Sequence, residues 1–369
     1  MASSRESEQP NDRHVHVVDV ERRRGRGARS NASGRYEKDV HEAFDDGWES
    51  LAELDAFKTE VFEDTAKSII ARNDSPDISF EASINPYRGC EHGCIYCYAR
   101  PTHAFHDLSP GLDFETKLFA KPDAPALLRI ELAKKGYRAS SLALGTNTDP
   151  YQPVETRLGI TRGILEVLAE TGHACTITTK SDRITRDIDI LAPMAARRLV
   201  AVALSVTSLD PRIHRTLEPR APHPEKRLKA IRALVDAGIP THINVAPIIP
   251  GITDHEIEAI LERGAAAGAR TASFIPVRLP HEVAPLFRDW LDTHYPERAG
   301  KVMSLIRSIR QERDNDPDFF SRMRGSGPWA DMIRARFRIA CKRLGLNQGR
   351  IELDESLFRP PEGPQLRLF

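Results

Sequence analysis

Between residues 78 and 276, short apolar runs alternate with amphipathic stretches that repeat apolar side chains every three or four positions. The short runs have the length and side chains of buried strands, and they are Phe80–Ile84, Ser141–Leu144, Cys175–Thr179, Val200–Ser205, His242–Pro247 and Ala272–Pro276. The amphipathic stretches have the period of helices, and they are Ala124–Lys135, Thr161–Thr171, Arg183–Ala196, Glu225–Ala237 and Asp254–Ala267. Several of them end at a glycine, which is a common helix stop.

Six alternating strand and helix units predict a parallel sheet with right-handed crossovers. Because a closed barrel of this type has eight units, the count alone permits a partial (β/α)6 barrel or an open doubly wound sheet. In both architectures ligands bind at the carboxyl ends of the strands. The polar candidates at those ends are Thr146, Asn147, Asp149, Lys180, Ser181, Asp182, Ser205, Thr207, Asn244 and Arg278.

The pattern changes on the N-terminal side of this core. Residues 1–45 are polar, with a basic centre between Arg22 and Arg29, and they predict a disordered arm because so little apolar surface cannot form a core. The arginines of this arm suit either phosphate contacts or a solvated tail. Residues 46–77 predict a helical lead-in, since apolar side chains recur every three or four positions from Val40 to Val61.

The alternation of strands and helices ends near residue 295, so residues 78–295 predict one core domain. Residues 296–350 predict a basic extension with helices around Lys301–Arg313 and Pro328–Leu344. Residues 301–350 hold 12 Lys and Arg against 5 Asp and Glu, which suits nucleic acid, an acidic electron donor or a solvated face. Residues 351–369 predict a disordered tail rich in proline and glycine.

Composition narrows the class of protein. The chain has 369 residues, of which 40% are apolar, and this is enough for a sizeable core. Its 53 basic and 53 acidic residues balance, so net charge gives no argument for nucleic acid from the protein as a whole. No apolar run is long enough to span a bilayer and no secretory signal is present. We therefore predict a cytoplasmic protein without membrane contact.

Three of the five cysteines, Cys90, Cys94 and Cys97, form a C-x3-C-x2-C array directly after the first predicted strand. Three thiolates on one short loop can close around one face of an iron–sulfur cube and leave the fourth iron open. Gly89 and Gly93 allow the tight turns that such a loop needs. The array therefore predicts a cluster with a free coordination site.

A single zinc ion is the alternative occupant, with His92 or His103 as its fourth ligand. Structural zinc sites normally divide their thiolates into C-x2-C pairs separated by a dozen or more residues, and the spacing here therefore favours a cluster. The other two cysteines, Cys175 and Cys341, fall within a predicted strand and a predicted helix, where we expect buried structural side chains.

The cysteine array, with Tyr96 directly before its last cysteine, resembles the signature of the radical S-adenosylmethionine (SAM) superfamily. Two segments, Arg88–Tyr98 and Gly145–Pro153, are similar to the spore photoproduct lyase-like branch of that superfamily. The resemblance extends over about residues 78–280. It implies a partial (β/α)6 barrel, in agreement with the six units counted above.

The resemblance also implies a mechanism. A 4Fe–4S cluster on the three cysteines would chelate SAM, and one electron from a flavodoxin or ferredoxin-type donor would release methionine and a 5′-deoxyadenosyl radical that abstracts hydrogen from the substrate. The residues that the resemblance assigns to SAM are Tyr96, Thr146, Asn147 and Ser205, with Pro247–Ile252 behind the adenine. Tyr98, beside the cluster, is a candidate catalytic radical relay or a packing residue.

The chain departs from the lyase branch in two respects. Spore photoproduct lyases use a further cysteine as hydrogen donor, whereas no cysteine lies between Tyr98 and Ala174 here. The segment after the second strand also lacks the Gly-Gly-Glu form of the superfamily. We predict a radical SAM enzyme that acts on DNA or RNA in a repair-like reaction. The alternatives are action on a small molecule or a protein, and a metal-bearing adaptor without catalysis.

The C-terminal residues Gln365–Phe369 resemble the short peptide with which many bacterial replication and repair proteins bind the DNA sliding clamp. Leu366, Leu368 and Phe369 offer apolar anchors, and the side chain of Gln365 offers amide hydrogen bonds. The preceding spacer, Pro360–Pro364, would hold the peptide clear of the barrel. A tail that folds back onto the domain is the alternative.

Deleting Gln365–Phe369 is expected to abolish binding to purified sliding clamp in a pull-down, because the deletion removes every apolar anchor of the peptide. A Cys90→Ala variant is expected to retain clamp binding, since the peptide lies outside the cluster loop. Clamp affinity that is unchanged by the deletion would contradict the docking prediction.

Overall fold

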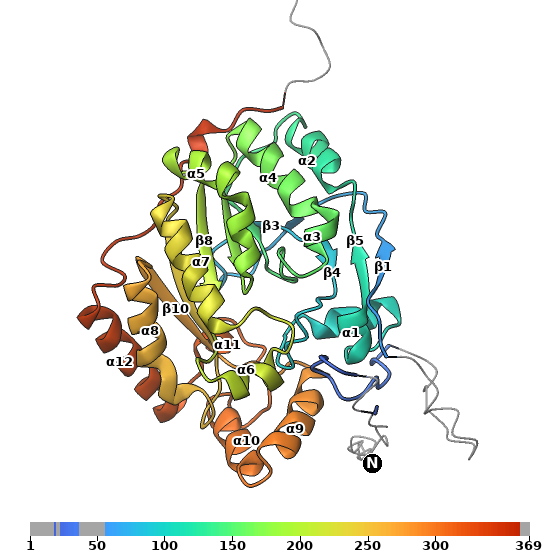
Figure 1. Cartoon of the computed structure of the whole chain (residues 1–369), viewed down its shortest axis with the longest axis vertical. Coiled ribbons are helices and arrows are strands. Elements are labelled where there is room, and N and C mark those ends of the chain that lie inside the picture. Colours follow the sequence, from blue (N-terminus) through green and yellow to red (C-terminus); the bar gives the residue numbers. More distant parts are fainter. Residues whose placement is uncertain (1–17, 20–22, 37–55, 362–369) are drawn as a thin grey trace, which may run out of the picture.

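The computed structural model describes residues 18–19, 23–36 and 56–361 (Figure 1). Its main sheet has the strand order β10-β9-β8-β7-β6-β3-β2. Strands β3 to β10 of this sheet run parallel, and they are β3 (Ala82–Ile84), β6 (Leu142–Leu144), β7 (Cys175–Thr179), β8 (Val200–Ser205), β9 (Thr241–Ile248) and β10 (Thr271–Pro276). The edge strand β2 (Ile70–Arg72) is antiparallel to β3. The six predicted apolar runs thus form the predicted parallel sheet.

Helices connect the parallel strands and lie along one face of the sheet (Figure 1). Those on predicted stretches are α2 (Ala124–Leu132), α4 (Ile160–Thr171), α5 (Ile188–Ala196), α7 (Pro224–Asp236) and α8 (Ile257–Ala266). A 3₁₀ helix, η2 (Asp182–Asp187), precedes α5, and another, η3 (Asp254–Glu256), precedes α8. The sequence pattern did not predict the short helices α3 (Glu155–Leu158) and α6 (Pro211–Leu217), nor α9 (Val283–His294).

Alternation along each strand separates an apolar outer face from a polar inner face. The outer residues Leu142, Val200, Leu204 and Ile243 are fully buried in the main apolar core. Their neighbours face the other way, into an interior cavity of about 1140 Å³. The strands line this cavity mostly with small and hydroxyl-bearing side chains, among them Ala143, Thr176, Thr178, Ala201 and Ala203, and residues 347–351 of the C-terminal segment also line it. The inside of the curved sheet is therefore an open space with both polar and apolar walls.

Hydroxyl groups of the neighbouring strand hold His242 in this cavity. Its Nδ1 lies 2.9 Å from Oγ1 of Thr271, and its Nε2 lies 2.7 Å from Oγ of Ser273. Ser273 in turn donates to Oδ1 of Asn244 at 2.9 Å. Burial lowers the pKa of His242 to about 4, and hydroxyl groups suit a neutral ring because each can donate or accept. His242 is therefore neutral at pH 7.

The predicted helical lead-in is wrong for residues 56–77, the part of it that the structure describes. This part forms strand β1 (Glu60–Glu63) and the edge strand β2. β1 pairs in parallel with β5 (Lys117–Ala120), which also pairs with β4 (Tyr87–Arg88). These partners lie far along the chain, and pairing with them outweighs the local apolar period. The rest of the predicted helix lies outside the described residues.

Much of the positive charge in the basic extension is paired with the barrel or buried. Helices α10 (Ala299–Ser308) and α12 (Gly327–Arg343) occupy the two predicted stretches. Arg336 and Arg343 of α12 form ion pairs with glutamates of α8. Arg310 is fully buried and donates to the carbonyls of Pro276 and Val277 at 2.8 and 2.9 Å. Less charge is therefore free to attract phosphates than the sequence count predicted.

Within the described residues, no helix is both long enough and apolar enough to cross a membrane. Arg22 and the C-terminal residues Gln365–Phe369 lie outside the described part of the chain. Phosphate contacts of Arg22 and clamp docking therefore stay predictions.

Replacing His242 by Gln is expected to make the unfolding free energy depend less on pH between pH 7 and pH 5. The folded-state pKa of about 4 lies below the ordinary value of 6.5, so the unfolded chain takes up this proton first as the pH falls. Above pH 6.5 the neutral His242 does not lower the unfolding free energy of the wild-type protein. Between pH 6.5 and pH 4 the unfolding free energy falls progressively, by about 2 kcal/mol at pH 5.

Urea unfolding of both proteins at pH 7 and pH 5 measures this effect. Gln retains a donor and an acceptor for the hydroxyls of Thr271 and Ser273. A loss of unfolding free energy between the two pH values that is equally large in the His242→Gln variant would contradict the prediction.

Candidate active site

The three cysteines lie on the loop after β4, where Cys90 and Cys94 are buried and Cys97 is half-buried. Gly89 and Gly93 have φ angles of 74° and 67°, which side-chain-bearing residues rarely adopt. A Cβ at Gly93 would lie 2.7 Å from Oε2 of Glu115. The loop therefore turns at positions that require glycine.

A buried ion pair holds this loop in place. Arg100 begins the 3₁₀ helix η1 (Arg100–His106) and Glu115 belongs to α1 (Leu112–Thr116). Both side chains are fully buried, with 2.5 Å between Nη2 and Oε1. Arg100 also donates to the carbonyls of Gly93 and Cys94, at 3.2 and 2.9 Å. The guanidinium thus fixes the backbone at the second cysteine.

Residues 23–36 pack against the cysteine loop, contrary to the disorder predicted for the arm. The N–H groups of Gly27 and Ala28 donate to the Glu115 carboxylate at 2.8 Å each. A Cβ at Gly27 would lie 1.9 Å from the carbonyl oxygen of Gly93, so the two backbones are in direct contact. Arg26 donates to the carbonyl of Glu115 at 2.9 Å. This arginine therefore binds the protein itself.

The segment Gly145–Pro153 holds the cysteine loop from another side. Gln152 donates to the carbonyl of Gly89 at 3.1 Å and accepts from the N–H of Glu91 at 2.9 Å. Asn85, at the end of β3, accepts from the N–H of Asn147 at 3.0 Å. This segment, on which the family resemblance partly rests, thus positions the cysteines as well as facing them.

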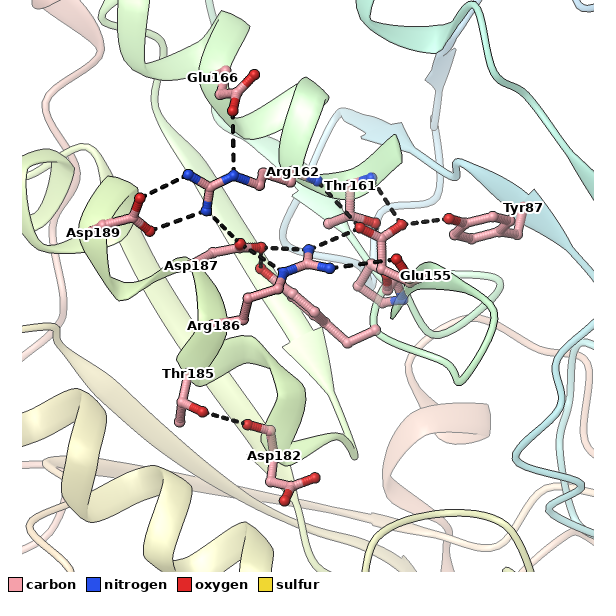
Figure 2. Close-up of polar contacts among 12 residues, drawn as sticks. Tyr87, Glu155, Thr161, Arg162, Glu166, Asp182, Thr185, Arg186, Asp187 and Asp189 are labelled. Carbon is pink, nitrogen blue, oxygen red and sulfur yellow. Dashed lines mark hydrogen bonds and ion pairs between the residues drawn. The ribbon is translucent and has the colours of Figure 1, made fainter. Parts of the chain in front are cut away.

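Figure 2 shows the charge network that fixes this segment. The hydroxyl of Tyr87 donates to Glu155, and that of Tyr151 donates to Asp187 at 3.0 Å. Arg186 bridges the two carboxylates, at 2.9 Å from each. Burial, followed by the charge of Glu155, raises the pKa of Tyr87, so its hydroxyl stays protonated. Because Tyr87 precedes the cysteines and Tyr151 belongs to the segment Gly145–Pro153, the network fixes this segment relative to the cysteine loop.

These contacts shape a cleft of about 100 Å³ at the three thiols. The predicted site residues that line it are Cys90, Cys94, Cys97, Tyr98, Thr146, Asn147 and Ser205, together with the strand-end candidates Asp149 and Lys180. The cleft shares Thr146 with the interior cavity, so the two adjoin. Other candidates lie elsewhere: Asn244 is bound inside the barrel, Ser181 and Asp182 begin η2, and Arg278 lies over the Tyr98 ring.

Tyr96, which the resemblance assigned to SAM, points into a buried network instead of the cleft. Its hydroxyl donates to Glu218 and lies 3.1 Å from Oγ1 of Thr207. Glu218 pairs with Arg227, and both side chains are buried. Arg227 also donates to the carbonyl of Ser205 at 3.0 Å. The network thus joins the cysteine loop to the end of β8.

Burial alone would raise the pKa of Glu218, but the charges of Arg227 and Lys180 and the hydrogen bonds from Thr207 and Tyr96 hold it below its usual range. Glu218 is therefore ionised beneath the cleft. Glu218, Arg227, Arg100 and Glu115 were not among the predicted site residues, because no spacing along the chain marks residues that meet only in the folded protein.

His92 lines the cleft with one ring nitrogen left open. Its Nδ1 lies 3.4 Å from Oδ2 of Asp149, and its buried Nε2 has no hydrogen-bond partner among the described residues. Asp149 also accepts from Thr179 Oγ1 at 2.6 Å and from the Lys180 N–H at 2.7 Å. Although burial opposes it, His92 and these hydrogen bonds lower the pKa of Asp149 to about 2. Nε2 of His92 is therefore free to form a hydrogen bond with a further polar group in the cleft.

The thiols have the chemistry of cluster ligands. Burial is the main cause that raises the pKa of all three, so the thiolates that ligation requires become stable only beside a compensating positive charge. Within the described part of the chain, no three metal-ligating side chains converge on one ion. His103 is bound to the carbonyl of Lys117 at 2.9 Å. The structure thus engages His103 elsewhere but places His92 at the thiols, so the choice of a cluster over a single zinc ion rests on the spacing of the cysteines.

Residues 84–264 match the family model of the radical SAM superfamily. An uncharacterized protein of Mycobacterium tuberculosis is 39% identical over 232 residues, which are 62% of this chain and 68% of the relative. An uncharacterized protein of Methanocaldococcus jannaschii is 28% identical over 240 residues, covering 65% of this chain and 85% of the relative. The chain belongs to the radical SAM superfamily, and it is a radical SAM enzyme.

Solved structures of spore photoproduct lyase share the fold. One, complexed with dinucleoside spore photoproduct, has a TM-score of 0.52 at 16% identity, covering 78% of this chain and 80% of that chain. Another, a variant with bound S-adenosylmethionine and dinucleoside spore photoproduct, has a TM-score of 0.50 at 15% identity, with the same coverage. These structures confirm the expected radical SAM barrel and its similarity in fold to spore photoproduct lyase.

Replacing Glu218 by Gln is expected to lower the unfolding free energy by about 3–5 kcal/mol, because Arg227 is then left as an unpaired buried charge. Glu225→Gln is the matched control. Its exposed ion pair with Arg263 contributes only about 0–1 kcal/mol. Urea unfolding at pH 7 measures both changes, and equal losses in the two variants would show that the buried network does not stabilise the site.

Proposed function

We propose that this radical SAM enzyme binds a 4Fe–4S cluster and SAM in the cleft and acts on nucleic acid. The observation that supports this most directly is the convergence of three thiols, the open Nε2 of His92 and the side chain of Lys180 on one cleft. Thiols supply cluster ligands, and the ammonium supplies a cation for an anionic cofactor group. The site adjoins an interior cavity with room for a substrate.

In this proposal Cys90, Cys94 and Cys97 would hold the cluster, and SAM would bind beside it in the cleft. When bound, the two would supply the radical chemistry by which hydrogen is removed from the substrate. Lys180, which forms no ion pair among the described residues, binds the SAM carboxylate. A flavodoxin or ferredoxin-type protein supplies the electron.

The polar residues around the thiols orient the rest of SAM. Thr146 and Asn147, on the loop after β6, bind the methionine amino group, and Ser205, at the end of β8, binds the ribose. Tyr96 acts indirectly, since its hydroxyl is bound to Glu218. Tyr96 positions the cysteine loop and does not contact SAM.

DNA or RNA is the proposed substrate because the fold resembles that of a lyase solved with a dinucleoside lesion. The reaction differs from that of the lyases, which use a further cysteine. Here Cys175 and Cys341 are buried in the main apolar core and cannot reach the cleft. Tyr98 lies beside Cys97 with 51% of its surface exposed, and its hydroxyl donates to the carbonyl of Thr146. It would take the place of a thiol and give a hydrogen atom to the product radical, and one electron from the donor protein with one proton would then restore the tyrosine.

Anaerobic reconstitution with iron and sulfide, followed by electron paramagnetic resonance of the reduced protein, tests the proposal. A signal that shifts on adding SAM supports an open iron site. Formation of 5′-deoxyadenosine is then measured without nucleic acid, with ultraviolet-damaged DNA and with RNA. Stoichiometric zinc without a cluster would overturn the proposed radical chemistry. A rate of 5′-deoxyadenosine formation that neither DNA nor RNA changes would overturn the proposed nucleic-acid substrate.

Cys90→Ala is expected to abolish both the cluster signal and 5′-deoxyadenosine formation, because one iron loses its protein ligand. Cys341→Ala, at a buried position of α12, is the matched control and is expected to retain both. Iron and sulfide content report cluster loading independently of activity. Full cluster loading and turnover in the Cys90→Ala variant would contradict the assignment.

A further inference from the structure

Two adjacent phenylalanine rings are exposed to solvent directly before the short helix α11 (Ser321–Arg324). Phe319 and Phe320 are 52% and 54% exposed. Phe320 has φ and ψ angles of 66° and −50°, the rare and strained conformation at the centre of a γ-turn that the N–H of Ser321 closes on the carbonyl of Phe319 at 2.8 Å. Exposed apolar surface and backbone strain both cost stability, and such features concentrate where a protein binds something.

Buried polar contacts keep the two rings in this exposed position. Asp77, whose side chain is almost completely buried, accepts the N–H of Phe320 at 3.0 Å and the Nε of Arg322 at 2.7 Å. The guanidinium of Arg322 lies 4.7 Å from the centre of the Phe319 ring. Arg310 donates to the carbonyls of Arg322 and Pro276, at 2.6 and 2.8 Å. The ring pair is thus tied to the carboxyl end of β10.

A cation without a carboxylate partner lies between these rings and the cleft. Arg278 follows β10, is half-buried, and forms no ion pair among the described residues. Its buried Nε has no hydrogen-bond partner in the described part of the chain. Its Nη1 lies 3.4 Å from Sδ of Met323 in α11, and its guanidinium lies 5.9 Å from the centre of the exposed Tyr98 ring. Aromatic and cationic groups therefore run from Cys97 to α11.

We propose that Phe319, Phe320 and Arg278 form a platform for unpaired nucleotides of the substrate. Bases stack on the two phenylalanine rings, and Arg278 binds a backbone phosphate, which places the next nucleotide at Tyr98 and the cleft. Stacking on aromatic side chains with a nearby cation is how proteins hold single-stranded nucleic acid. This inference rests on the proposed nucleic-acid substrate and adds where that substrate binds.

A single strand fits this surface better than an acidic protein does. Arg322 is already paired with Asp77, and Arg278, which forms no ion pair among the described residues, is half-buried between Met323 and Tyr98. A flexible strand can place one phosphate at such a position while its bases lie flat on neighbouring rings. Guanidinium groups bind phosphate oxygens through parallel N–H bonds.

Fluorescence anisotropy of the reconstituted full-length enzyme with a labelled single-stranded oligonucleotide tests the platform. The double variant Phe319→Ala/Phe320→Asn is expected to raise Kd at least about tenfold, with Asn chosen because it tolerates a positive φ. Phe319→Leu/Phe320→Leu keeps apolar surface without a stacking face and is expected to weaken binding similarly. Arg278→Gln is expected to reduce the slope of log Kd against log salt by about 0.7.

Phe62→Ala is the matched control, since this exposed phenylalanine lies on β1 of the separate three-stranded sheet. The SAM-induced shift of the cluster signal verifies that each variant is folded and loaded. Wild-type affinity in the double alanine/asparagine variant, or a slower reduction by flavodoxin with unchanged oligonucleotide affinity, would overturn the platform alone. A wild-type enzyme that forms 5′-deoxyadenosine yet binds no oligonucleotide would overturn the nucleic-acid substrate, and the platform with it.

Discussion

The cysteine loop keeps its shape because a buried guanidinium binds its backbone. Arg100 donates to the carbonyls of Gly93 and Cys94 and to Glu115, and also to the carbonyls of Pro110 and Gly111. Burying two charges costs several kcal/mol per ion unless each donor and acceptor finds a partner. Here two of the partners, the carbonyls of Gly93 and Cys94, belong to the loop itself. Any other loop conformation would leave a buried charge unsatisfied, so the three thiols are positioned by the protein.

Arginines paired with buried carboxylates also join distant elements elsewhere around the cleft. Glu218 and Arg227 join Tyr96 to the end of β8, and Arg186 joins the residues before the cysteines to the segment Gly145–Pro153. Each network connects elements that are far apart in the chain and that meet near the carboxyl ends of the parallel strands. The cleft is therefore rigid on several sides, while the barrel interior beside it stays open. Rigid placement of the reacting groups is what radical chemistry requires of the protein.

Charge in this protein serves structure more than its count along the chain suggests. Arginines of the N-terminal segment and of the basic extension bind carboxylates and carbonyls of the barrel. An ion pair between neighbouring elements cancels charge that a sequence count would assign to the surface. Near the cleft, Lys180 and Arg278 form no ion pair among the described residues and stay available to an anionic ligand.

The sequence by itself determined the parallel strands, most of the connecting helices and the three cysteines, because apolar periodicity and close spacing are local properties. It also predicted most of the cleft, since Thr146, Asn147 and Ser205 follow from the rule of strand ends. Only the tertiary structure decided that residues 56–77 form strands, that residues 23–36 pack on the cysteine loop, and that Tyr96 points away from the cleft. These outcomes depend on hydrogen-bond partners such as Glu115 and Glu218, and burial makes such partners obligatory only after distant parts of the chain have come together.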